Sequence, residues 1–270
     1  MKIKFIKSIS YLWIFIFAAT IMISSCNKEP EAMTLPPFES LSLDVSKFPS
    51  PVKKSEYLSR SAYNHAAYKV FVMNAVVIAN VALPVLAYRE ALDHSASYLG
   101  DNMWKWSYEV TIKDTVYEAS LIGTWLDEDW FSMEMSLSQQ GGYQNFKWFY
   151  GEIKHNHTEA NWTLYRNPAD TVAYLGIEFQ KDFTTDIGSI KYEVIDEKDP
   201  YYAAYIEYGT YGTDPSLDFD SYYTVYNNDS TINIEWNTIS GAGRVKSPFF
   251  KDSDWHCWDS SLNDVECAMR

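Results

Sequence analysis

The sequence lacks the short motifs by which many enzymes are recognised. It contains no Gly-x-Ser-x-Gly, no His-Glu-x-x-His, no phosphate-binding glycine loop and no Gly-x-Gly-x-x-Gly after a strand. Histidine is also scarce, with five residues in a chain of 270, which leaves few nitrogen ligands for a metal. We therefore predict no catalytic residue, no metal site and no cofactor, and we favour a non-enzymatic role.

Basic residues are few as well. The chain has 22 Lys and Arg against 36 Asp and Glu, a net charge of −14. Residues 1–25 contain three lysines and no acid, so their removal would lower the charge to −17. Affinity for nucleic acid comes largely from Lys and Arg that neutralise phosphates, so a nucleic-acid partner is excluded. Attachment to anionic lipid by overall charge is disfavoured for the same reason, and the acidity suits a soluble exposed surface.

Cysteine occurs three times, and the first cysteine ends an N-terminal segment with three parts. A basic start (Lys2, Lys4 and Lys7) precedes an apolar run over residues 12–23 and the small residues Ser-Ser-Cys at 24–26. This order is typical of an export signal. A membrane-spanning helix needs about 18 or more apolar residues, so the run is short for a permanent anchor. An uncut N-terminal membrane helix is the alternative.

The end of this segment carries a resemblance. Ile-Ser-Ser-Cys, residues 23–26, resembles the lipobox of bacterial lipoproteins, with Ile23 where leucine is frequent. The following residues, Cys-Asn-Lys-Glu-Pro-Glu, are similar to the lysine-then-acid export signal of Bacteroidota surface lipoproteins. The resemblance implies cleavage before Cys26, a lipid on its thiol, and an outer-membrane lipoprotein, with exposure at the cell surface left open. The implied domains are a signal peptide (1–25), a lipidated tether (26–37) and one domain (38–270).

The other two cysteines, Cys257 and Cys267, lie ten residues apart. An exported chain meets an oxidising compartment, so we predict that they form a disulfide. Two free thiols, or a metal site that includes the adjacent His256, are the alternatives. The pair would tie a tail over residues 247–270.

Apolar residues at helical spacing indicate a helical part over residues 55–98, with Ser55 in a plausible cap region. Pro84 should break or kink it, giving a kinked helix or a helix pair. The stretch from Val70 to Tyr88 is strongly apolar, so a transmembrane helix must be weighed. Asn74 and Asn80 interrupt the stretch, and we favour a buried helix wrapped by sheet.

From Trp104 the apolar residues alternate with polar ones, which predicts strands. About ten strands with turn signals between them fill residues 104–246, and no helical stretch separates them. Consecutive strands with short turns pair antiparallel. The predicted fold is therefore mostly β with N-terminal helices (α+β). It is a curved antiparallel meander that resembles, in architecture only, the half-barrel of bacterial lipoprotein-carrier proteins; a closed barrel is the rival shape.

The preferred function is binding, and the aromatic content of 17% supplies two versions of it. A cavity between the sheet and the helix at 70–92 would hold an apolar ligand against Trp106, Phe131, Met133 and Met135. A glycan-binding surface would instead expose Trp125, Trp130, Trp148 and Trp162 on one rim. An envelope protein is a further possible partner. For each of these residues the alternative is a side chain that fills a dry core.

Some polar patterns offer weaker hypotheses. Paired acids could serve a carboxylate-dependent hydrolase or a calcium site, although aspartate is common in turns. His155 and His157 have the spacing of a strand-borne metal pair. Asp-Thr-Val at 114–116 and 170–172 and Asp-Ser-Thr at 229–231 resemble the O-glycosylation sequon of exported Bacteroidota proteins. The acid pairs are Asp127 with Asp129, Asp218 with Asp220, and Asp252 with Asp254.

Overall fold

The computed structural model describes residues 31–50 and 60–267. The chain divides into two units, Met1–Ala32 and Met33–Arg270. Of the first unit only residues 31 and 32 are described, and they form neither helix nor strand. The predicted signal peptide, Cys26 and the start of the tether lie outside the described residues. The fold below is that of the second unit.

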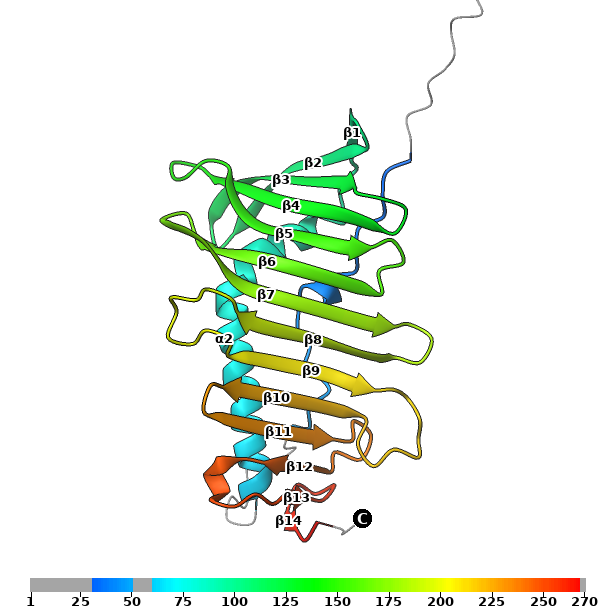
Figure 1. The fold of residues 1–270 in the computed structure, drawn as a ribbon, viewed down its shortest axis with the longest axis vertical. Coiled ribbons are helices and arrows are strands. Elements are labelled where there is room, and N and C mark those ends of the chain that lie inside the picture. Colours follow the sequence, from blue (N-terminus) through cyan, green and yellow to red (C-terminus); the bar gives the residue numbers. More distant parts are fainter. Residues whose placement is uncertain (1–30, 51–59, 268–270) are drawn as a thin grey trace, which may run out of the picture. The chain divides into compact units, whose positions relative to one another are not determined.

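This unit contains one antiparallel sheet of fourteen strands, in which every strand pairs with its neighbours in sequence (Figure 1). The order β1 to β14 is linear and does not close into a barrel. The strands are β1 Ser97–Gly100, β2 Met103–Ile112, β3 Thr115–Trp125, β4 Trp130–Gln139, β5 Phe146–Lys154, β6 Glu159–Asn167, β7 Asp170–Asp182, β8 Ile187–Val194, β9 Tyr205–Tyr211, β10 Ser221–Asn227, β11 Ser230–Trp236, β12 Gly243–Lys246, β13 His256–Trp258 and β14 Asp264–Val265.

The strands form because one side of each is apolar and the turns between them suit hairpins. In β2 the side chains of Trp104, Trp106, Tyr108 and Val110 are buried, and those between them are more exposed. Between β2 and β3 the chain turns through Lys113 and Asp114, which both have positive φ values of 47° and 64°. Two successive left-handed residues are the geometry of the tight hairpin turn that matches strand twist.

The strand count and the shape correct the sequence-based prediction. The ten predicted strands correspond to β2–β11, and the antiparallel meander is confirmed. The count of about ten is wrong, because β1, β12, β13 and β14 were missed. These four have two to four residues each, too few to show an alternating pattern. A closed barrel is also wrong, since β1 and β14 are the two free ends of the order.

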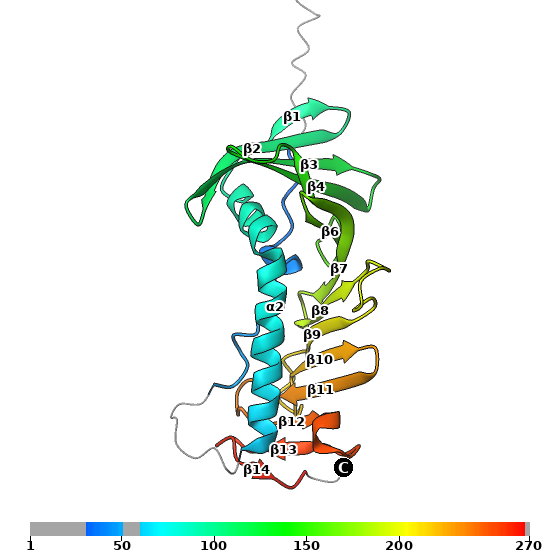
Figure 2. The same cartoon turned by 90° about the vertical axis from the view of Figure 1, so that its left-hand side faces the viewer.

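One long helix, α2 (Ser61–Ala91), lies across the strands on one face of the sheet (Figures 1 and 2). Pro84 sits inside it without ending it, and Figure 2 shows the axis changing direction toward the C-terminal end. The predicted kink is therefore present, in a single helix. Among the described residues α2 alone is long and apolar enough to cross a membrane by length and composition, and only 33% of its most apolar window is buried. The sheet covers one side of α2 and does not wrap it.

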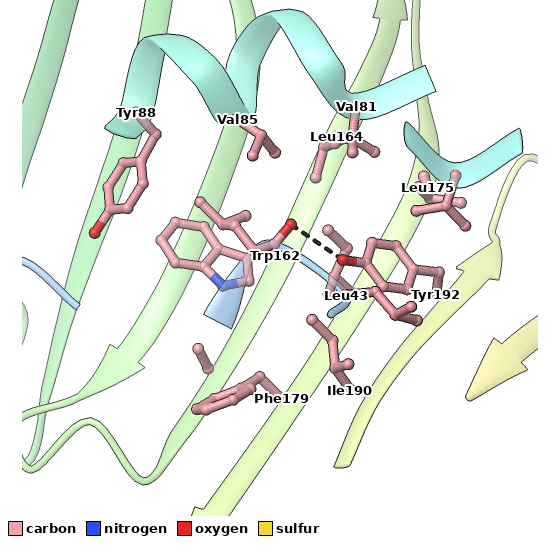
Figure 3. Close-up of a cluster of buried hydrophobic side chains, with 14 of the residues drawn as sticks. Leu43, Val81, Val85, Tyr88, Trp162, Leu164, Leu175, Phe179, Ile190 and Tyr192 are labelled. Carbon is pink, nitrogen blue, oxygen red and sulfur yellow. Dashed lines mark hydrogen bonds between the residues drawn. The ribbon is translucent and has the colours of Figure 1, made fainter. Parts of the chain in front are cut away.

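An N-terminal arm, residues 33–50 with the short 3-10 helix η1 (Phe38–Ser40), lies beside α2 on the same face of the sheet. Three tyrosine hydroxyl groups donate hydrogen bonds to its carbonyl oxygens. Tyr88 bonds Pro36 at 2.6 Å, Tyr192 bonds Leu41 at 3.1 Å (Figure 3), and Tyr63 bonds Pro49 at 2.7 Å. The arm also buries five apolar side chains, Met33, Leu41, Leu43, Val45 and Phe48.

The C-terminal tail joins the sheet through β13 and β14 and contains a second 3-10 helix, η3 (Pro248–Phe250). Cys257 in β13 and Cys267 lie at disulfide distance, with Cα atoms 5.2 Å apart. The predicted pairing is present, and it closes the last hairpin of the sheet.

Candidate ligand-binding groove beside helix α2

The inner face of the sheet is covered unequally on the two flanks of α2. On one flank the arm lies over β7, β8 and β9 around Phe179, Ile190 and Tyr208. On the other flank, at the opposite ends of the same strands, no segment of the described chain lies over the sheet, and a groove of about 500 Å³ remains. This volume falls within the range of small-molecule sites.

The wall formed by α2 follows from helical spacing. Lys69, Met73, Val76, Val77 and Asn80 lie three and four residues apart, so their side chains share one side of the helix. All but Lys69 and Asn80 are apolar. The Asn80 amide donates to the Val76 carbonyl at 2.8 Å, which uses one of its two donors inside the helix.

The floor is the sheet itself. Alternate residues of a strand point to one face, and on the face toward α2 they are mostly aliphatic: Val225 pairs with Ile206 and Ile232, Ile206 with Tyr192, and Leu175 with Val194. The groove crosses five strands, β7 to β11, which corresponds to about 19 Å at the usual strand spacing. The floor and far wall are formed by Tyr174, Leu175, Tyr192, Val194, Tyr201, Ala204, Tyr205, Ile206, Val225, Tyr226, Asn227, Ser230 and Ile232.

One lip of the groove is the loop between β8 and β9, residues 195–204, which supplies Tyr201 and Ala204. Arg166 at the end of β6 holds this loop. Its guanidinium donates to Asp196 at 2.7 Å and to Asp199 at 3.0 Å, and it lies over the Tyr174 ring at 4.3 Å. A guanidinium that is both paired and stacked is well ordered. Arg166 therefore holds the β8–β9 loop against β6 and β7.

Two of the tyrosines that line the groove have raised pKa values. Burial, and then the nearby Asp199 carboxylate, raises the pKa of Tyr174. Burial also raises the pKa of Tyr192, whose hydroxyl is engaged with the arm. Tyr205 and Tyr226 pair on the opposite face of β9 and β10, where their rings stack with centroids 5.1 Å apart. The lining contains one cation, Lys69, and no carboxylate, so it presents mainly aliphatic side chains with few polar groups.

The side chains predicted to line a ligand cavity lie elsewhere. Trp106, Phe131, Met133, Met135, Trp148 and Trp162 are at most 8% exposed and belong to the main core, toward β2–β6. None of them lines the groove. Figure 3 shows Trp162 in this core with Tyr88 and Val85 of α2 above it.

The remaining glycan-site candidates, Trp125 and Trp130, are half-buried. Trp125 packs against the His155 ring at 4.0 Å and against Phe131 at 5.4 Å. The Lys154 ammonium lies 5.8 Å from the centroid of the Trp130 ring. Both indoles are thus occupied by neighbours from adjacent strands, and Trp148 and Trp162 do not join them on a rim.

The paired acids mostly have local partners. Asp127 accepts the backbone N–H groups of Asp129 and Trp130 at 2.8 Å. Asp220 accepts the backbone N–H of Thr238 at 3.0 Å, and Asp252 contacts His256 at 3.1 Å. Such bonds stabilise turns. The described residues contain no group of three or more His, Cys, Asp or Glu suited to a metal ion, His155 and His157 included.

The three proposed sequons all fall at hairpin turns, directly before or at the start of β3, β7 and β11. Asp114 adopts a left-handed conformation with φ of 64°, which aspartate tolerates better than most residues. Turn geometry thus accounts for at least this aspartate, and glycosylation stays a prediction.

Two other cavities are more polar. One, about 270 Å³, lies between the arm and β7–β9. The other, about 620 Å³, lies at the C-terminal tail among Asp252, Asp254, Asp264 and Glu266. Comparison of the chain with protein-family models, with curated proteins and with solved structures gives no significant match. The groove is therefore interpreted from its own chemistry.

Proposed function

We propose that this protein is a lipid-anchored envelope protein that binds an elongated apolar ligand in the groove beside α2, without catalysing a reaction. The observation that supports ligand binding is the groove itself, with about 500 Å³ lined mainly by aliphatic side chains and with no carboxylate. Ligand sites are typically concave and mostly apolar with a few placed polar groups.

The groove also limits the shape of the ligand. It runs across five strands, about 19 Å, so an extended chain fits it better than a compact polycyclic molecule. Lys69 is the one charged group in the lining. A ligand with an apolar chain and an anionic end, such as a fatty acid or a related lipid, would place its charge near Lys69 and its chain against Val77, Ile206 and Val225.

Anchoring rests on the sequence alone. Cys26 follows an export signal and completes a lipobox-like motif. Acyl chains on its thiol would hold the protein on a membrane, because each buried CH₂ contributes about 0.8 kcal/mol. Metabolic labelling with an alkyne fatty acid tests this. We expect label in the wild-type chain and none in Cys26→Ser; equal labelling of both would refute anchoring at Cys26.

The binding proposal is tested by filling the groove. Val225 of β10 lines it, and Thr224, one residue earlier, points to the other face of the same strand. We expect Val225→Trp to abolish binding of a fluorescent fatty acid and Thr224→Trp to leave it unchanged. Native mass spectrometry of protein purified without detergent should show a lipid-sized adduct in the wild type and in Thr224→Trp only. Absence of both adduct and probe binding in the wild type would overturn the proposal.

A further inference from the structure

The side of α2 that faces away from the sheet is apolar and exposed. Tyr68, Phe71, Ile78 and Leu86 are 61%, 45%, 51% and 41% exposed. They recur at intervals that place them, with the small residues Ala75 and Ala82, on one stripe of the helix. The opposite stripe, which includes Val70, Val77, Val81 and Tyr88, is buried against the sheet. Figure 2 shows the sheet on one side of α2 only.

The charge around this stripe differs from that of the rest of the chain. Residues 60–89 contain Arg60, Lys69 and Arg89 and no acid, whereas the whole chain carries 36 acids and a net charge of −14. Between Lys69 and Arg89 no residue is charged, a distance of about 30 Å along the helix. The apolar stripe is thus bounded by cations inside an otherwise anionic protein.

This charge pattern disfavours a second copy of the chain as the occupant of the stripe. Two α2 helices paired antiparallel about Ile78 would bring Lys69 of one copy near Arg89 of the other. Parallel pairing would oppose Lys69 to Lys69 and Arg89 to Arg89. The one acid of α2 is Glu90, which already lies 3.8 Å from His94 of its own chain, so the cations face mainly cations, and like charges in a desolvated contact are costly.

We propose that the outer stripe of α2 docks on an anionic lipid bilayer, with the helix lying in the interface. An apolar helix face bounded by cations is the pattern of interfacial helices, which insert about 5–10 Å into the headgroup–acyl boundary. Lys69 and Arg89 would reach lipid phosphates, since long basic side chains keep their charge at the interface. The nearest acids, Glu90 and Asp264, lie at the two ends of α2, and the helix between Lys69 and Arg89 carries no acid, so the overall acidity does not reach the centre of the stripe.

Docking would also set the position of the groove. Val76 is 50% exposed and lines the groove, and Tyr201 on its lip is 57% exposed. The groove mouth is therefore continuous with the docking stripe. An apolar ligand could pass between bilayer and groove without crossing water. This consequence rests on the proposed ligand binding, whereas docking itself does not.

The test reports the position of α2 directly. The test protein is the full chain with Cys26→Ser and Ile78→Cys. Because Cys257 and Cys267 are paired, the cysteine at position 78 is its one reactive thiol. That thiol carries an environment-sensitive NBD dye. The matched control carries the dye on Thr224→Cys, on the face of the sheet away from α2. Vesicles are phosphatidylcholine alone, or phosphatidylcholine mixed with phosphatidylglycerol.

We expect a blue shift and a rise in emission for the dye at position 78 with mixed vesicles, and no change at position 224. Lipids brominated near the headgroup should quench the dye at 78 more than lipids brominated at the chain end. Arg89→Gln should weaken the response with mixed vesicles. Val225→Trp should leave docking intact while it removes ligand binding, so the failure of one proposal does not imply failure of the other.

Three outcomes would overturn docking. The dye at 78 could keep the same spectrum with and without vesicles. It could respond equally at 78 and 224, which would indicate attachment through another part of the chain. It could be shifted before vesicles are added, and concentration dependence of that shift would then assign the stripe to a second copy.

Discussion

At the scale of single residues, three glycines are each covered by the ring of the aromatic residue directly opposite them on the next strand. Gly151 pairs with Trp162, Gly209 with Tyr222, and Gly243 with Trp258. In each pair the ring lies over the glycine, and a Cβ atom there would come within 2.0, 2.4 and 2.2 Å of it. The missing side chain therefore makes room for the ring, an arrangement known to pin strand register.

The first prediction concerns Gly151. We expect Gly151→Ala to lower the free energy of unfolding by about 1–3 kcal/mol, the usual effect of overpacking, because Trp162 is 2% exposed and has no free space to move into. Urea unfolding measures the change. Gly176→Ala in β7 is the control, since its Cβ would meet no ring, only Ile195 Cγ2 at 3.1 Å and the Glu193 carbonyl oxygen at 3.9 Å. Equal losses in the two variants would show that the ring contact is not the cause.

His65 provides the second prediction. Burial, and then the Lys69 ammonium, lowers its pKa below 6.5, and its ring contacts the Ser247 hydroxyl at 2.9 Å. The folded state therefore favours the neutral ring, and the unfolded state binds a proton first as pH falls. Its contribution to stability is complete above the unfolded pKa of about 6.5 and is lost as pH falls from there toward the folded pKa.

We therefore expect stability to decrease between about pH 7.5 and about pH 5.5, and His65→Gln to show a shallower decrease. Urea midpoints across this range measure both slopes. The pKa of His157 is also lowered by burial, so a residual slope of the same sign should remain in the variant. Identical slopes would remove His65 as a contributor.

At the scale of elements, the first turn of α2 is capped from the far end of the chain. The Asp264 carboxylate of β14 accepts the backbone N–H groups of Ser61 at 2.8 Å and Ala62 at 2.9 Å. Arg60 before them provides no side-chain cap. A carboxylate at this position satisfies free N–H groups and lies favourably against the helix dipole.

The third prediction follows from this cap. We expect Asp264→Ala to lower the free energy of unfolding by about 1–2 kcal/mol. Glu266→Ala is the matched control, because it removes a nearby exposed acid that makes no such bond. Chemical denaturation followed by far-UV circular dichroism compares the two. A loss in Glu266→Ala as large as that in Asp264→Ala would mean that general charge, not capping, is responsible.

The elements differ in how well the sequence predicts them. Strands β2–β11 have seven or more residues each, which is long enough to show the alternation of apolar and polar residues that predicts a strand. The predicted helix ran to residue 98, but α2 ends at Ala91 and Ser97 begins β1. The predicted start at 55 lies outside the described residues. The cap of α2 could not be predicted, because its donor and acceptor are 203 residues apart.

The sequence predicted a space between the helix and the sheet, but it did not predict where along the sheet that space lies. A space between α2 and the sheet follows from an apolar helix crossing strands, but its location depends on which flank the arm covers. The arm is held by the hydroxyl groups of Tyr63, Tyr88 and Tyr192, contacts that no local pattern reveals. The large aromatic residues of β2–β6 suggested the wrong end of the sheet because ring size alone does not distinguish a core from a binding surface.

At the scale of the whole molecule, the linear strand order limits how far a local change can spread. Each strand pairs only with its sequence neighbours, and α2 and the arm are the segments that span many strands. In such arrays stability is largely a sum of neighbour contacts.

The fourth prediction is that reduction of the Cys257–Cys267 pair acts locally. A disulfide that closes a loop of this length stabilises the folded state by roughly 3 kcal/mol, and reduction removes this contribution. The strand β14 has only two residues to hold it in place without the disulfide. We expect faster hydrogen exchange in β13, β14 and the first turn of α2, because Asp264 loses its position. Exchange in β4–β7 should be unchanged. Mass-spectrometric exchange with and without reductant measures this, and faster exchange throughout the sheet would contradict it.

The linear order also bears on how the chain is made. Whether it leaves a ribosome or an export channel N-terminus first, the chain presents α2 before β1 and then the strands in the order in which they pair. Each hairpin can therefore form on the edge of the preceding one, because no strand pairs with a strand that is distant in the sequence. The exception is α2, whose N-terminal turn receives its cap only when Asp264 emerges. Folding can thus begin before the whole chain has emerged, but it finishes only with the last few residues.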